Sequence, residues 1–150
     1  MRWTQIEGSK WTIPSELTKS GRLHEIPFPR LGLHVLSTCQ TTDDLVFSTT
    51  GVTPFSGFTK AKRRLDDMSG TSEWRIHDLR RTVASGMAHL EVSPHVVERI
   101  LNHSTGALGG VAGIYNRHGY LKEKSDALQK WGEHLEELTD SHLENVVYLK

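Results

Sequence analysis

The most constraining feature of this 150-residue chain is a change of hydrophobic periodicity near residue 28. Before it, Trp11 and Ile13 alternate with polar residues, and residues 23–28 repeat this extended pattern. After Pro27 and Pro29, apolar residues recur every three or four positions, which is the spacing of amphipathic helices. The change predicts an α+β fold that is mainly α, with a small N-terminal antiparallel three-stranded sheet.

Turn residues divide the extended region into three strands. The first strand is expected over residues 3–6, before the turn at 7–9. The Lys-Ser-Gly run at 19–21 supplies turn residues between the second and third strands. The sheet is therefore a meander, and Lys19 is expected at the tip of its second hairpin.

Five helices are expected after the sheet. The apolar spacing places a short one before Cys39 and others over about 58–68, 78–90, 94–101 and 121–138. Gly70 is suited to end the second helix, and Ser93-Pro94 is suited to begin the fourth. Residues 139–150 are expected to form a tail that is flexible or that packs in trans on another copy.

Composition favours a single globular domain in a reducing compartment. Cys39 is the single cysteine, so an internal disulfide is excluded. Net charge is zero, but residues 1–120 hold 14 Lys and Arg against 11 Asp and Glu, while residues 121–150 hold 4 against 7. The nine histidines show no ligand spacing typical of a metal site. No run of residues is apolar enough to predict a membrane span.

Four residues in the second half of the chain have the chemistry to hold a phosphodiester and attack it. His77 and Arg80 lie three positions apart, on nearly the same face of a helix. His103 follows the next helix, and Tyr115 follows a glycine-containing stretch. Arginine can donate to two phosphate oxygens, histidine can donate or transfer a proton near neutral pH, and tyrosine can be a covalent nucleophile.

Each residue also has an ordinary explanation when it is taken alone. Arg80 would more often be a surface arginine, and His77 a capping or packed histidine. His103 suits a helix C-terminus because it can interact with the last carbonyl groups. A turn lysine such as Lys19 is usually only solvated. The catalytic interpretation therefore depends on the order of the motifs.

That order resembles the catalytic domain of the tyrosine recombinases, and most closely the integrases of prophages and genomic islands. The resemblance covers about residues 1–138. The motifs of that family correspond in this chain to Lys19, His77, Arg80, Leu101-Asn102-His103 and Tyr115. Each motif alone is weakly diagnostic, whereas four in the family's order, separated by helical patterns, point to this family.

The resemblance implies a role for each of these residues. Tyr115 would attack phosphorus and form a 3′-phosphotyrosyl bond, and Arg80 would clamp the phosphate oxygens. His103 would donate to the phosphate, and His77 would help in positioning or proton transfer. Lys19 would protonate the leaving 5′ oxygen. Tyr120 and Tyr148 are competing nucleophiles, but the family places its tyrosine just before an Arg-His pair, here residues 117–118.

Two positions depart from the family pattern. Asn102 stands where glycine is commoner. The family also carries a first-box arginine on a helix before the first strand, and Arg2 resembles instead the arginine that precedes a strand tryptophan, here Trp3. The resemblance therefore implies that residues 1–150 are a partial catalytic domain, without the first-box helix and without an N-terminal DNA-binding domain.

The implied activity is site-specific recombination that integrates or excises a mobile element. The implied partners are double-stranded DNA and other recombinase protomers, which assemble as a tetramer on DNA. No cofactor, metal or membrane is implied, and the compartment is the bacterial cytoplasm. Candidate contacts to the DNA backbone are Arg81, Arg117, Lys60 and Arg63.

Two alternatives remain open at the level of sequence. Residues 80–101 also have the pattern of a helix-turn-helix, so the chain could be a non-catalytic DNA-binding module. It could also be an inactive remnant of an integrase. The charge run around Lys60 and Arg63 is as well explained by a solvated helix face as by phosphate contact.

Overall fold

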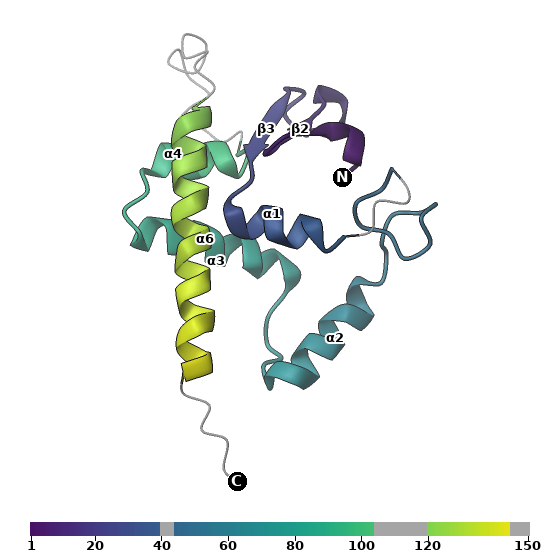
Figure 1. Ribbon diagram of the computed structural model, residues 1–150, viewed down its shortest axis with the longest axis vertical. Helices are drawn as coiled ribbons and strands as arrows, with labels where there is room; N and C mark the ends of the chain where they lie inside the picture. Colours follow the sequence, from purple (N-terminus) through teal and green to yellow (C-terminus); the bar gives the residue numbers. More distant parts are fainter. Residues whose placement is uncertain (40–43, 104–119, 145–150) are drawn as a thin grey trace.

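The computed structural model is mainly helical, with one small sheet near the N-terminus (Figure 1). It describes residues 1–39, 44–103 and 120–144. The predicted fold class is confirmed. The described elements, in chain order, are η1 (Trp3–Gln5), β1 (Ile6–Glu7), β2 (Lys10–Ile13), η2 (Ser15–Leu17), β3 (His24–Pro27), α1 (Arg30–Ser37), α2 (Phe58–Ser69), α3 (Ile76–His89), α4 (Pro94–Ile100) and α6 (Leu121–Glu144).

The sheet is an antiparallel meander with β2 in the centre. Trp11 is opposite Ile6 on one side and Ile26 on the other. The first strand is shorter than predicted, because residues 3–5 form a 3-10 turn. In that turn the side-chain oxygen of Gln5 accepts the backbone N–H of Arg2 at 3.0 Å and the indole N–H of Trp11 at 3.3 Å. These contacts replace the strand pairing that alternation alone had predicted.

The core lies where α3, α4 and α6 meet. Met87 on α3 is completely buried, and its neighbours in the core are Val96, Val97, Ile100, Leu101 and Ala127. Gly86 allows α3 and α6 to approach closely, because a Cβ atom at this position would overlap the ring of Trp131. The apolar positions of α4 thus belong to this core.

Helix α6 joins the helical core to the sheet, since it packs on β3, α1 and α4. Lys124 is only 4% exposed, and its ammonium group donates to the backbone carbonyl of Glu25 in β3. The Glu25 carboxylate also pairs with Lys10 of β2 at 2.7 Å. The helix continues to Glu144, so residues 139–144 extend the last helix rather than beginning the tail; residues 145–150 lie outside the described part of the chain.

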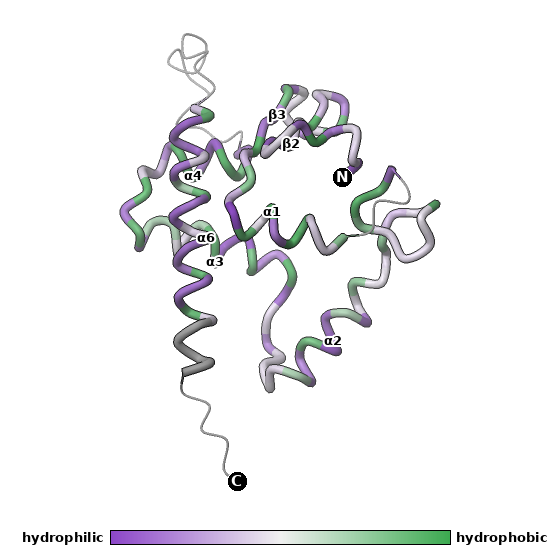
Figure 2. The backbone as a smooth tube through the Cα atoms, viewed as in Figure 1, coloured by the Kyte–Doolittle hydropathy of each residue, from purple (hydrophilic) through white to green (hydrophobic). Residues whose placement is uncertain are grey.

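Helix α2 stands apart from the core (Figures 1 and 2). Its predicted start and end agree with the structure, and Gly70 ends it in a left-handed conformation with φ 67°. Its apolar stripe is not buried, however, since Phe58, Leu65 and Met68 are all more than half exposed. The stripe predicted a helix correctly but not its packing. Among the described residues, no helix is both long and apolar enough to cross a membrane.

Candidate active site

The start of α3 positions the predicted His-x-x-Arg motif. The Asp78 carboxylate accepts the backbone N–H of Arg75 at 2.8 Å, which caps the helix and lowers the pKa of that carboxyl group. The helix begins at Ile76, two residues earlier than predicted. His77 is consequently inside the first turn and exposed, while Arg80 lies one turn later and is half-buried.

The end of α4 positions the Leu-Asn-His motif. The backbone N–H of His103 donates to the carbonyl of Glu98 at 3.0 Å, and that of Asn102 to Arg99 at 3.4 Å. This is the Schellman arrangement, in which the residue after the helix adopts the left-handed conformation. Asn102 does so with φ 52°. The family's usual glycine and the asparagine found here are the two residue types that tolerate this conformation best, which explains the substitution.

Two side chains from other elements reach the last carbonyl groups of α4. Arg80 donates through Nη2 to the carbonyl of Leu101, and His24 of β3 lies with Nε2 3.1 Å from the carbonyl of Ile100. A helix C-terminus has unpaired carbonyl groups and a partial negative charge, so both donors are favourable there. The contact holds the Arg80 guanidinium beside the His103 turn.

His24 is a site residue that the sequence interpretation missed. It is half-buried, and burial lowers its pKa, with the positive charge of Lys124 as the next cause. The carbonyl of Ile100 opposes this shift, and Arg80 adds a smaller lowering. At neutral pH the ring is therefore neutral and donates through Nε2. The strand pattern around residue 24 gave no signal of this role, because it arises only when α4 packs near β3.

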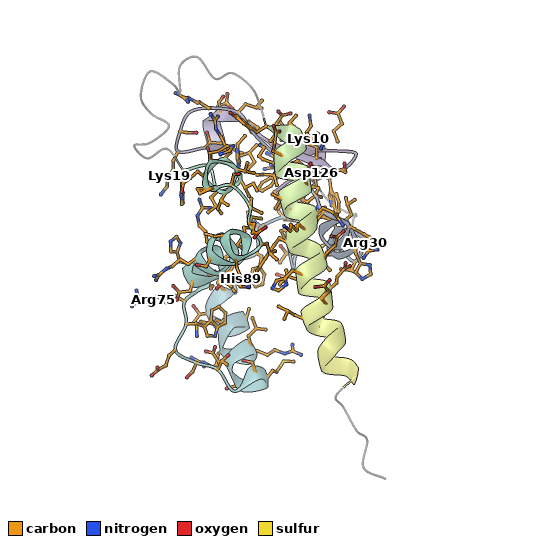
Figure 3. The ribbon with its side chains drawn as sticks, turned by 90° about the vertical axis from the view of Figure 1, so that its left-hand side faces the viewer. Lys10, Lys19, Arg30, Arg75, His89 and Asp126 are labelled. Atoms are coloured by element: carbon orange, nitrogen blue, oxygen red, sulfur yellow. The ribbon has the colours of Figure 1, made fainter. Side chains whose placement is uncertain are left out.

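The Lys19 loop reaches the same turn. Lys19 is exposed and follows η2, in a connection between β2 and β3 that is longer than a tight hairpin. The next residue, Ser20, lies with its hydroxyl 3.4 Å from the side-chain oxygen of Asn102. Figure 3 shows Lys19 and Arg75 at the same edge of the molecule, away from α6. The loop thus brings Lys19 to the side of the molecule that carries the α4 terminus.

His103 is held by a carboxylate from the preceding helix, α4. Its Nδ1 lies 3.1 Å from Oε2 of Glu98, and both side chains are about 40% exposed, at 40% and 39%. Glu98 therefore contacts His103 twice, through its backbone carbonyl and through its carboxylate.

The structure brings two of the predicted catalytic residues, Arg80 and His103, to one turn, and the loop that carries Lys19 contacts the same turn. His77 is exposed on the same helix as Arg80, and among the described residues no hydrogen bond joins it to the α4 turn. Tyr115 and Arg117 lie outside the described residues, as does Tyr148. Tyr120 packs on α4, with its ring 5.5 Å from that of His95 and 5.2 Å from the guanidinium of Arg99.

The other predicted DNA contacts are more scattered. Arg81 is exposed and pairs weakly with Asp78 at 3.5 Å. Lys60 and Arg63 are exposed on α2. An open cavity of about 870 Å³ borders the start of α2, and it is lined by Met1, Cys39, Leu45, Val46, Phe47, Ser48, Thr49, Thr50, Gly51, Pro54, Phe55 and Phe58. That cavity includes none of the predicted catalytic residues, so the candidate site is a surface turn rather than this pocket.

Comparison with known proteins supports the family that the motifs resemble. The phage integrase family matches residues 1–120, which include every motif from Lys19 to Tyr115. No match is found among curated proteins or among solved structures. Because the match covers most of the chain, the protein belongs to the phage integrase family, a family of tyrosine recombinases.

Proposed function

We propose that this chain is a catalytic domain that breaks and rejoins DNA during the integration or excision of a mobile element. One observation supports this most directly. A single turn at the end of α4 carries His103, receives the guanidinium of Arg80 from α3 and contacts the Lys19 loop through Ser20. The turn thus has a histidine, an arginine from a second element and, next to it, the loop that carries a lysine, and these are residue types that can stabilise a phosphodiester.

The proposed reaction is a transesterification. The phenol oxygen of Tyr115 attacks phosphorus and its proton passes to His77, while the bond from phosphorus to the 5′ oxygen breaks. Lys19 gives a proton to that leaving oxygen. Arg80 and His103 donate to the non-bridging oxygens, whose negative charge grows in the transition state. The 3′-phosphotyrosyl bond conserves the energy of the broken ester, so rejoining needs neither a nucleotide cofactor nor a metal.

Double-stranded DNA is the proposed partner, bound at the edge that bears Lys19 and Arg75. Arg81, Lys60, Arg63 and Arg117 are proposed to contact phosphates, and other protomers are proposed to complete a tetramer on DNA in the bacterial cytoplasm. Phosphate contacts would make binding fall steeply with salt. Lys60 and Arg63 lie on α2, which stands apart from the core. In this proposal they would therefore contact DNA phosphates other than the one that reacts.

A non-catalytic DNA-binding module, or an integrase remnant without turnover, is the second candidate. Its support is the match of α3 and α4 to a helical pair around a short turn, together with the position of Arg2 before Trp3, which resembles the arginine before a strand tryptophan rather than a first-box arginine. Both candidates bind DNA. They differ in whether a covalent bond forms.

The deciding experiment is a single-turnover assay with labelled nicked duplex DNA, read on a denaturing gel. We expect a slow covalent adduct, because a missing arginine donor costs about 10²–10³ in rate without preventing attack. Tyr115→Phe should abolish the adduct and leave reversible DNA binding unchanged, because it removes only the phenol oxygen. Tyr120→Phe is the matched control and should retain the adduct.

A reversible band shift with no adduct would support the module or the remnant. An adduct that persists in Tyr115→Phe and disappears in Tyr120→Phe would move the nucleophile to the other tyrosine.

A further inference from the structure

The contact between Glu98 and His103 fixes the histidine ring at two points. The backbone N–H of His103 donates to the carbonyl of Glu98, and this bond fixes the position of the His103 backbone from which the side chain extends. The ring is then bound at Nδ1 by Oε2 of the same residue, at 3.1 Å. The left-handed conformation of Asn102 makes both contacts possible, because it turns the chain back over the last turn of α4.

The chemistry of the pair assigns the proton on the ring. An ionised carboxylate can only accept hydrogen bonds, so Nδ1 must carry a proton and donate it. Nε2 lies on the opposite side of the ring and is directed away from Glu98. A second proton at Nε2 would then make the ring a cationic donor, between the Glu98 carboxylate and an anion on its other side.

We propose that Glu98 is a positioning residue for His103, which holds Nε2 toward a DNA phosphodiester and offsets the charge of the doubly protonated ring. This inference rests on the proposed function, since the anion is the phosphate at which strands are exchanged. In this proposal Glu98 acts only through His103. Carboxylates behind functional histidines have this orienting effect at metal sites and in hydrolases.

A purely structural role for Glu98 would have a different signature. A carboxylate near the end of a helix is unfavourable toward the helix dipole, so removing it would not by itself weaken α4. The pair is also well exposed, at 40% and 39%, and exposed ion pairs contribute little to stability. A change in Glu98 should therefore leave folding and reversible DNA binding nearly unaltered while it alters the chemical step.

The test compares adduct formation in wild type, Glu98→Ala, Glu98→Gln, His103→Ala and the double variant Glu98→Ala/His103→Ala. Glu98→Ala should slow adduct formation by about 10- to 100-fold, as the loss of other partners behind functional histidines does. Glu98→Gln should recover part of the rate, because the amide oxygen can still accept from Nδ1 but carries no negative charge to offset that of the ring. The double variant should be no slower than His103→Ala, since Glu98 acts only through the ring. Glu73→Ala, in the exposed connection before α3, is the control for loss of one negative charge.

A second measurement does not depend on activity. In protein labelled with ¹⁵N-histidine, the ring spectrum of free wild type should show His103 protonated at Nδ1, and the nicked duplex should perturb Nε2. In Glu98→Ala, the preference for a proton at Nδ1 and the perturbation of Nε2 by the duplex should both be lost.

The outcomes separate the two proposals. Equal adduct rates in wild type and Glu98→Ala, or a double variant slower than His103→Ala, would overturn the role of Glu98 alone. No adduct in wild type would overturn the proposed function. In that case, a His103 ring with the same protonation in wild type and Glu98→Ala would overturn the positioning role as well, whereas an altered ring would support it.

Discussion

His24 couples the stability of the protein to pH through its surroundings. Burial, Lys124 and Arg80 all favour the neutral ring, so the pKa of His24 lies below its usual value of 6.5. Between the lowered pKa of the folded state and the value of 6.5 in the unfolded chain, the unfolded chain binds more protons than the folded one. The free energy of unfolding therefore falls as pH is lowered through 6.5. The neutral ring also supplies the donor to the Ile100 carbonyl at the end of α4.

We expect His24→Gln to reduce this loss of stability on acidification. The amide can still donate to the Ile100 carbonyl, but it does not titrate. Urea denaturation at about pH 7.5 and about pH 5.5 measures the difference, which should be smaller in the variant than in wild type. His34→Gln, an exposed substitution on α1, serves as the control and should behave as wild type. An undiminished pH dependence in His24→Gln would assign it to other groups.

At the level of single residues, the sequence was informative where the backbone itself was constrained. The Leu-Asn-His motif predicted a helix end at residues 101–103, and Asn102 is there in the left-handed conformation. His24, Glu98 and Lys124 gave no comparable signal. Their roles depend on neighbours that are brought close only by packing. His24 of β3 bonds to a carbonyl group of α4, and Lys124 of α6 bonds to a carbonyl group of β3. Glu98 contacts His103 only because the turn after α4 reverses the chain.

At the scale of elements, the contact of α3 with α6 depends on one missing side chain. Gly86 lies in the middle of α3 against the ring of Trp131, which leaves no room for a Cβ atom. Alanine normally stabilises a helix interior by up to about 1 kcal/mol relative to glycine. The packing conflict acts in the opposite direction, and overpacked cores lose about 1–3 kcal/mol.

We therefore expect Gly86→Ala to destabilise the protein despite its better helix propensity. Chemical denaturation of Gly86→Ala, Trp131→Leu and the double variant measures the effect, and the double variant should recover part of the loss. Ser85→Ala, at the exposed neighbouring position, is the control and should be neutral or slightly stabilising. A stabilised Gly86→Ala would show that the two helices can separate at little cost.

Periodicity predicted which elements form more reliably than where they pack. The bounds of α2 agree closely with its apolar spacing, yet Leu65 and Met68 are 52% and 74% exposed. Spacing reports that a helix has an apolar face, and it does not report what covers that face. At residues 3–5, by contrast, the element itself was predicted wrongly. A strand was expected, but these residues form a 3-10 turn in which the side chain of Gln5 accepts two hydrogen bonds.

At the scale of the whole molecule, we expect a polypeptide of residues 1–150 to carry out almost no complete recombination when it is assayed alone. We propose that Arg80 gives one guanidinium contact to the reacting phosphate. The family resemblance implies a second such contact from a first-box arginine, which this polypeptide is expected to lack. Complete exchange requires several such steps in sequence, each slowed by about 10²–10³. A recombination assay between two DNA sites measures this, with the single-turnover adduct assay as its internal control.

Robust strand exchange by this polypeptide would show that another residue supplies the missing contact. Addition in trans of a protomer that carries a first-box arginine but has its nucleophile replaced by phenylalanine would then test whether protomers share that residue.

The placement of α6 also gives the molecule an electrical polarity. The sequence of α6 holds 3 Lys and Arg against 7 Asp and Glu, whereas Lys19 and Arg75 project from the edge away from α6. A protein with zero net charge feels no net attraction to a polyanion at long range. If its positive and negative charges lie on different sides, however, the electric field around the polyanion exerts a torque on it. With DNA as the proposed partner, this torque would turn the edge that bears Lys19 and Arg75 toward the duplex, over a range limited by the Debye length of about 8 Å in physiological salt.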